Sequence, residues 1–343
     1  MSLRFPNDIG DNIMKTHSIT RRAALGTLGA GLLGAAGSVL AQAGPYPNKP
    51  IRIIVPWAAG GGGDVLVRMA APGLQQRLGQ PIVVENKPGA IGTIGSLAAA
   101  RSPADGYTLL YGSADSHSIA PQVFKQAPYD SKKDFVAVAP IGFPPIALVV
   151  HASHPAKTFE QFLKMAREAK PPLTYGSWGP GGSGHITGEA LKQAAKIDLL
   201  HIPYNGTAPL LQAELANQVD CAINTLPVVE PHIRSGVLRV LAIVAKQRLQ
   251  DFPDVPILKE IGIGIEIGGW IGFLAPAGVP PDILAKLHDA IEATLREPAY
   301  VEQMKKMTMI PDYQDQRSYQ AFYLSEFDRW GQYVRNARVT VDQ

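Results

Sequence analysis

Two glycine-rich segments have the composition of anion-binding loops. Residues 58–64 and 177–185 each follow a short apolar run and precede an amphipathic stretch, so each is expected to connect a strand to a helix. Glycine leaves the backbone N–H groups of such a loop accessible, and the amides at a helix N-terminus favour a negative charge. Ser177 and Ser183 add hydroxyl groups to the second segment. Either segment alone could be only a tight turn, but two in equivalent places favour binding of a small dianion across a cleft.

Nucleotide-binding motifs fit these segments poorly. Gly179, Gly181 and Gly184 satisfy the G-x-G-x-x-G spacing of a dinucleotide-binding loop. The acidic residue that would bind a ribose at the end of the next strand is missing, because residues 202–204 read Ile-Pro-Tyr. Residues 58–64 lack the G-K-[ST] ending of a P-loop. We therefore expect no nucleotide cofactor.

Signals for catalysis or metal binding are weak. Ser183 misses the G-x-S-x-G nucleophile motif by one residue, because His185 stands where the second glycine should be. A Ser183–His185 pair has no evident acidic partner, so a carboxylate-ester hydrolase is the less favoured alternative. His151 and His154, three residues apart, are a poor metal-binding pair. The sequence favours a binding protein that is not an enzyme and holds no metal.

Composition narrows the class further. The 343 residues are 46% hydrophobic and 18% charged, which favours a folded chain with sizeable cores over a disordered one. A formal net charge of +3 without a basic run gives no support to nucleic-acid binding. The single cysteine excludes an intramolecular disulfide. The 34 glycines and 29 prolines indicate many turns.

The first 43 residues have the features of an export signal. Arg21 and Arg22 precede a stretch without charge over residues 23–40, and residues 41–43 read Ala-Gln-Ala. This pattern predicts a signal peptide of the twin-arginine type, cleaved after Ala43 to leave a nearly neutral periplasmic chain. A membrane anchor is the alternative, and Met14 is an alternative start.

Short apolar runs alternate with amphipathic segments over the rest of the chain, which predicts an α/β fold with mainly parallel sheets. Asp64 is expected to cap the helix that follows, and Pro72-Gly73 to kink or break it. Six aromatic residues at helical spacing in 318–334 are expected to form a packing face. The expected strands are 51–57, 81–85, 107–112, 147–150, 173–177, 199–202, 221–223, 237–244 and 271–274; the expected helices are 65–78, 92–100, 159–169, 185–195, 209–216, 281–296 and 318–334, with a polar loop at 113–118.

Several motifs occur in an order that resembles one family. They include Tyr-Pro-Asn-Lys-Pro-Ile at 46–51, Val-Glu-Asn-Lys-Pro-Gly-Ala at 84–90, Asp-Gly-Tyr-Thr-Leu-Leu at 105–110, Pro-Tyr-Asp at 128–130, His-Ile-Pro-Tyr at 201–204 and Leu-Ala-Pro-Ala-Gly at 274–278. Together they resemble the substrate-binding proteins of tripartite tricarboxylate transporters, the Bug or TctC-like family. The resemblance implies a two-lobed type II periplasmic binding fold with a hinged ligand cleft. It also implies delivery of a carboxylate to a permease with a large and a small subunit, or presentation of it to a membrane kinase.

The resemblance also implies a division of the chain and a set of ligand-binding residues. Residues 44–144 would form the first part of lobe 1, 145–268 lobe 2, and 269–343 the returning segment and C-terminal helices of lobe 1, in a monomer. The bulky Trp178, opposite Trp57, suggests a flat slot for an aromatic mono- or dicarboxylate, although both rings could serve packing alone. Asn224 stands where the family often has aspartate, which argues against recognition of an ammonium group. The implied ligand-binding residues are Trp57, Ala59, Gly60, Gly61, Gly62, Gly63, Asp64, Ser113, His117, Ser177, Trp178, Gly179, Gly181, Ser183, His185 and Asn224.

Overall fold

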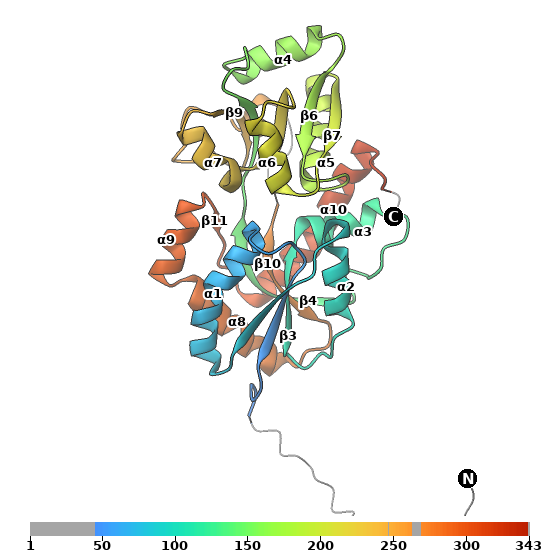
Figure 1. Ribbon diagram of the computed structural model, residues 1–343. Coiled ribbons are helices and arrows are strands. Elements are labelled where there is room, and N and C mark those ends of the chain that lie inside the picture. Colours follow the sequence, from blue (N-terminus) through green and yellow to red (C-terminus); the bar gives the residue numbers. More distant parts are fainter. Residues whose placement is uncertain (1–44, 246, 263–268, 342–343) are drawn as a thin grey trace, which may run out of the picture. The chain divides into compact units, whose positions relative to one another are not determined.

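The computed structural model describes residues 45–245, 247–262 and 269–341 (Figure 1). The predicted signal peptide lies outside these residues. Within the described ranges, no helix combines the length and the apolar character that crossing a bilayer requires.

A six-stranded sheet with its helices forms what we call lobe 1. Its strand order is β11-β4-β10-β3-β1-β2, and β1 is parallel to both of its neighbours, whereas β10 is antiparallel to β3 and β4. The strands are β1 (Ile51–Val55), β2 (Ile82–Asn86), β3 (Thr108–Ser113), β4 (Phe135–Phe143), β10 (Ile271–Pro276) and β11 (Ile310–Pro311). The helices are α1 (Gly62–Leu78), α2 (Thr93–Ala100), α3 (Ala120–Val123), α8 (Pro281–Leu295), α9 (Pro298–Lys306) and α10 (Gln316–Ala337), with the short turns η1 (Ala90–Gly92) and η2 (Ala114–Ile119).

A five-stranded sheet with its helices forms lobe 2. Its strand order is β7-β6-β8-β5-β9, with β6 parallel to β7 and β8, and β5 antiparallel to β8 and β9. The strands are β5 (Ile146–His151), β6 (Leu173–Ser177), β7 (Leu199–Pro203), β8 (Cys221–Thr225) and β9 (Leu238–Val244). The helices are α4 (Phe159–Glu168), α5 (Ser183–Ala195), α6 (Thr207–Leu215) and α7 (Leu226–Arg234), with the turn η3 (Leu258–Ile261). The predicted division of the chain at 144/145 and 268/269 stays a prediction.

The expectation of mainly parallel sheets is wrong. Each sheet is mixed, because β5 and β10 are the strands on which the chain enters one lobe after leaving the other, and both run against their neighbours. Segments far apart in sequence therefore lie together: the N-terminal α1 packs beside the C-terminal α8 in lobe 1 (Figure 1).

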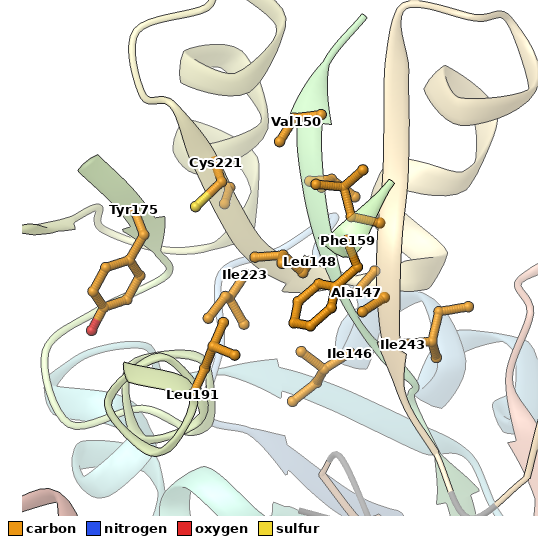
Figure 2. Packing of buried hydrophobic residues seen from close by; sticks show 14 of the residues in the cluster. Ile146, Ala147, Leu148, Val150, Phe159, Tyr175, Leu191, Cys221, Ile223 and Ile243 are labelled. Carbon is orange, nitrogen blue, oxygen red and sulfur yellow. The ribbon is translucent and has the colours of Figure 1, made fainter. Parts of the chain in front are cut away.

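Each lobe has its own apolar core. In lobe 2 the side chains of Ile146 and Leu148 on β5 pack with Phe159 of α4 and Ile223 of β8, all buried (Figure 2). In lobe 1 the aromatic face of α10 is confirmed as packing, since Tyr319, Tyr323 and Trp330 are at most 2% exposed. The lobe 1 cluster that contains these aromatic residues also includes Ile186 of α5, so this packing joins the two lobes.

The predicted break of α1 and the predicted cap at its start are wrong, while the predicted kink stays a prediction. The helix runs without interruption from Gly62 to Leu78 with Pro72 inside it. Gly73 allows α1 to approach α8 closely, because an added Cβ would lie 2.6 Å from Thr294 Cγ2, and this packing supports a continuous helix. The N-cap is Gly61, while Asp64 stands in the first helical turn.

Candidate ligand-binding site

A cavity of about 800 Å³ lies between the two lobes. Its walls are mostly apolar, and the described residues that line it include no charged side chain, so they suit an apolar molecule better than a highly charged one. Lobe 1 contributes Trp57, Ala58, Pro88, Gly89, Ala90, Ile91, Thr93, Ile94, Leu97, Phe124 and Pro128; lobe 2 contributes Trp178, Gly179, Pro180, Gly182, Tyr204, Asn205 and Gly206; Val341 completes the wall. Of the predicted site residues, Trp57, Trp178 and Gly179 line this cavity.

The first glycine loop runs from the end of β1 into α1 and continues from the cavity wall at Ala58. Ala59, Gly60 and Gly62 are exposed, and Gly61 and Gly63 are half-buried. Within the described residues, no hydrogen-bond partner is found for the amides of Gly62 and Gly63 in the first turn of α1. These N–H groups are available to an anion, and the helix dipole favours one there.

Asp64 stabilises the first loop from within. Its carboxylate accepts hydrogen bonds from the Gly60 amide at 2.9 Å, Asn86 Nδ2 at 2.9 Å and Arg68 Nε at 2.9 Å. Burial acts to raise the pKa of Asp64, but the bonds from Arg68, Gly60 and Asn86 outweigh it, so the pKa lies below its ordinary value. Asp64 therefore stays ionised and shapes the loop rather than presenting its charge to a ligand.

Tyr111 of β3, which is not among the predicted site residues, packs against this loop. An added Cβ at Gly63 would lie 2.7 Å from Tyr111 Cε1, so only glycine allows the ring to approach the first turn of α1. The ring is 5% exposed. Burial and the nearby Tyr300 and Asp115 raise the pKa of Tyr111, so its hydroxyl keeps its proton.

Gly63→Ala is therefore expected to lower both stability and ligand affinity, because the methyl group must displace a buried ring or shift the start of α1. Overpacking of this kind costs about 1–3 kcal/mol. Gly62→Ala is the matched comparison, since its added Cβ meets nothing within 4 Å. Thermal melting and calorimetric titration should show a clearly larger loss for Gly63→Ala; equal losses would mean that the contact with Tyr111 has no role.

The second glycine loop runs from β6 into α5, and the amides of Gly181 and Ser183 already have partners. Gly181 N donates to His185 Nδ1 at 2.9 Å. Ser183 N donates to Asp115 Oδ1 at 2.8 Å, and the indole Nε1 of Trp178 donates to Asp115 Oδ2 at 2.8 Å. Asp115 belongs to η2 of lobe 1, so its carboxylate joins the two lobes at the N-terminus of α5.

Asp115 is also absent from the predicted site residues. The segment 113–118, predicted as a polar loop that contributes Ser113 and His117, forms a π-helical turn. Ser113 and Ser116 satisfy each other's backbone amides in a capping box. An acidic residue two positions after Ser113 was the only sequence signal for this contact. Its partners could not be found from the sequence, because they lie 63 and 68 residues further along the chain.

Four of the predicted polar residues, Ser113, Ser177, Ser183 and Asn224, are buried and do not line the cavity. Asn224 Nδ2 donates to Glu214 Oε1 at 2.9 Å. This contact fixes Asn224 inside lobe 2.

His117 lies in the core of lobe 1. The ring is fully buried, with centroids 4.6 Å from Phe135 and 5.6 Å from Tyr129. Burial lowers the pKa of His117 to about 3, so it is neutral at physiological pH. In this arrangement it does not reach the cavity.

Trp178 forms a flat wall at the start of α5. An added Cβ at Gly184 would lie 2.6 Å from Trp178 Cζ3, and one at Gly182 would lie 3.1 Å from Trp178 Nε1. The glycines of this loop thus make room for the indole, which is 9% exposed and held by Asp115. Trp57 lines the cavity from the opposite lobe.

A serine–histidine pair exists in lobe 2, although not the one considered from the sequence. Ser177 Oγ lies 2.7 Å from His201 Nε2, while His185 stacks on His201 with centroids 3.8 Å apart. Burial, together with His185 and Lys192, lowers the pKa of His201 to about 3. Ser177 is 0% exposed, so a substrate has no approach to its hydroxyl. Among the described residues, no cluster of three potential metal-ligating side chains occurs.

Two α/β lobes that hold a cavity between strand-to-helix loops define a type II periplasmic binding fold. The family model for the tripartite tricarboxylate transporter family receptor matches residues 66–339. The chain belongs to this family, which confirms the resemblance seen in the sequence.

Known relatives are similar over nearly their whole length. The protein BugT of Bordetella pertussis is 33% identical over 296 residues, covering 86% of this chain and 91% of BugT. A Rhodopseudomonas palustris protein solved with adipate superposes with a TM-score of 0.79 at 28% identity, covering 87% of this chain and 100% of that one. MatC of the same organism, solved with bound malate, gives a TM-score of 0.75 at 29% identity over 84% of this chain and 100% of its own.

Proposed function

We propose that this protein is a periplasmic solute receptor that closes its two lobes on a small organic acid with an aromatic body. The carboxylate binds the free amides of the first glycine loop, and the ring lies between Trp57 and Trp178. The receptor then delivers the ligand, as a monomer, to the large and small membrane subunits of a tripartite tricarboxylate-type permease. A twin-arginine signal, cleaved after Ala43, exports it.

The observation that carries this proposal is the cavity itself. Within the described residues it has an apolar wall without a charged side chain, two tryptophans from opposite lobes, and an adjacent helix N-terminus with unpartnered amides. The adipate and malate complexes of the two relatives support a carboxylate as the ligand class. Hydrogen bonds to a charged group contribute about 1.5–3 kcal/mol each, so a few of them with ring burial reach micromolar affinity, about 8 kcal/mol.

Several features favour binding without turnover. The buried Ser177–His201 pair offers no accessible nucleophile. Ligand contacts from both lobes would shift the population of the hinged chain toward its closed form, which a permease can recognise. We therefore infer a transport receptor and no enzymatic activity.

The test is a thermal-shift screen with benzoate, its uncharged analogue benzamide, and the non-aromatic cyclohexanecarboxylate. Benzoate is expected to raise the melting temperature most, and benzamide to have no effect, because only an anion gains from the helix N-terminus. If none of a wider panel of aliphatic and aromatic carboxylates shifts the melting temperature, the protein is not a carboxylate receptor.

Trp178→Ala is expected to weaken binding of the best aromatic ligand by about tenfold, since aromatic contacts contribute about 0.5–1.5 kcal/mol beyond their buried area. Trp178→Phe is the matched control, because it keeps a ring and removes only the N–H donor to Asp115. Calorimetry should place Trp178→Phe near the wild type. Unchanged affinity in Trp178→Ala would remove the stacking part of the proposal.

A further inference from the structure

Asp115 occupies the position where the second glycine loop would bind an anion. Its two carboxylate oxygens lie 2.8 Å from two donors of lobe 2, the Ser183 amide and the Trp178 indole N–H. Ser183 is the first residue of the 13-residue helix α5, so the carboxylate lies at the positive end of that helix. The Asp115 side chain belongs to lobe 1 and is only 8% exposed.

The two loops are therefore not equivalent in their capacity for a ligand. In the first loop the aspartate, Asp64, bonds to Arg68, Asn86 and Gly60, and the amides of Gly62 and Gly63 are left without partners among the described residues. In the second loop the amide of Ser183 already serves a carboxylate of the protein. The sequence predicted a dianion held at both loops, but at the second loop the Asp115 carboxylate already binds the Ser183 amide.

The charge of Asp115 is compensated only by neutral donors. No ion pair with Asp115 is found in the described part of the chain, and the cavity wall has no lysine, arginine or histidine. A second ligand carboxylate near α5 would thus meet a like charge without a cation between them. Juxtaposed like charges in a poorly solvated site repel strongly.

We propose that Asp115 is a specificity-determining residue that supplies the second carboxylate from the protein itself and so restricts the ligand to one carboxylate. This inference rests on the proposed function and narrows its ligand from a small organic acid with any number of carboxylates to a monocarboxylate. The ligand's charged end binds at the first loop, and the end that faces Trp178 and α5 is uncharged. Asp115 also holds the indole of Trp178 in place through Nε1.

The experiment is calorimetric titration of the full mature chain with two pairs of ligands that differ by one carboxylate, benzoate against terephthalate and hexanoate against adipate. The wild type is expected to bind the monocarboxylate of each pair at least about tenfold more tightly. Asp115→Ala frees the Ser183 amide and the indole N–H, so this preference should fall by at least about tenfold or reverse. Asp115→Asn removes the charge and keeps an acceptor, and its preference should lie between the two.

Trp178→Phe is the control for a purely structural role of the bond to the indole. It removes one donor but keeps the charge of Asp115, so its preference for one carboxylate should persist even if overall affinity falls. Thermal melting of each variant shows whether it is folded. If both Asp115 variants unfold, the inference is tested by the wild type and Trp178→Phe. Both should prefer the monocarboxylate of each pair, and loss of this preference in either would contradict the role of Asp115.

The possible outcomes separate this inference from the proposed function. A wild type that binds terephthalate or adipate as tightly as the matched monocarboxylate would overturn the role of Asp115 and leave the carboxylate receptor intact. An unchanged preference in a folded Asp115→Ala protein would do the same. Absence of binding by all four acids and by the wider panel would instead overturn the proposed function and the inference together.

Discussion

Replacing His117 by phenylalanine is expected to make the protein markedly more resistant to acid. Between pH 6.5 and pH 4.5 the wild type should lose about 2 kcal/mol more unfolding free energy than His117→Phe, because one histidine contributes up to about 1.4 kcal/mol per pH unit and is already half protonated in the unfolded chain at pH 6.5. The reason is burial, which lowers the pKa of His117 to about 3 in the folded chain, against 6.5 for an unperturbed imidazole.

The sign follows from proton binding. Below pH 6.5 the unfolded chain takes up a proton at His117, while the folded chain does not until pH approaches 3. The stability that the neutral ring contributes is therefore present in full above pH 6.5 and is lost as the pH falls through the window from 6.5 to 3. Phenylalanine fits the aromatic surroundings of the ring and also removes Nε2, which is buried without a partner among the described residues.

Glu214→Gln provides a control of opposite sign. Burial raises the pKa of Glu214 to about 8, although Asn224 opposes this through a hydrogen bond. The folded chain keeps this proton between pH 4.5 and pH 8 while the unfolded chain releases it, so the wild type loses stability as the pH rises through that window. The unfolding free energy of Glu214→Gln relative to the wild type should therefore increase as the pH rises, whereas that of His117→Phe should increase as the pH falls.

Urea denaturation at half-unit pH intervals from 4 to 8 measures both effects. Differences between each variant and the wild type matter, because other titrating groups contribute equally to both. Parallel stability curves for His117→Phe and the wild type below pH 6.5 would show that the ring is protonated without cost, contrary to its burial.

The strand-to-helix units were predictable because their signals are local. The strand at 173–177 was placed correctly, and Thr158 caps α4 through a hydrogen bond from the Gln161 amide. Apolar runs and capping residues act within a few positions, so one sequence suffices to find them. The strand β4 and the helix α7 were missed; α7 contains two prolines, which obscure a helical pattern.

The site was only partly predictable, for a physical reason. The glycine loops and the two tryptophans could be found from composition and position. The roles of Tyr111 and Asp115 depend on contacts across a sheet and between lobes, with Asp115 bonding to residues 63 and 68 positions away. The direction in which His117 points was likewise decided by the π-helical turn η2, which the polar sequence of 113–118 does not reveal.

Gly272 of β10 supports this turn indirectly. β10 lies between β3 and β4, and its residue Ile271 pairs with Ser113 at the start of η2. The Ala114 amide donates to the Trp270 carbonyl at 3.0 Å, which connects the same strand to the turn that carries Asp115. Tyr319 of α10 packs directly on Gly272. An added Cβ at Gly272 would lie 2.0 Å from Tyr319 Oη and 2.8 Å from the Ala139 carbonyl oxygen.

Gly272→Ala is therefore expected to lower the unfolding free energy by about 3 kcal/mol or more, the upper range for overpacking in a core. Neither neighbour can easily make room for the added methyl group, because Tyr319 is only 1% exposed and the Ala139 carbonyl is part of the paired strand β4. Gly269→Ala is the matched control, because the nearest atom to its added Cβ is Pro144 Cγ at 3.8 Å, an ordinary contact. Urea denaturation should separate the two variants clearly. Equal stability of the two variants would show that α10 can shift without cost. Because β10 contacts the turn that carries Asp115, a folded Gly272→Ala protein should also discriminate less between mono- and dicarboxylates than Gly269→Ala does.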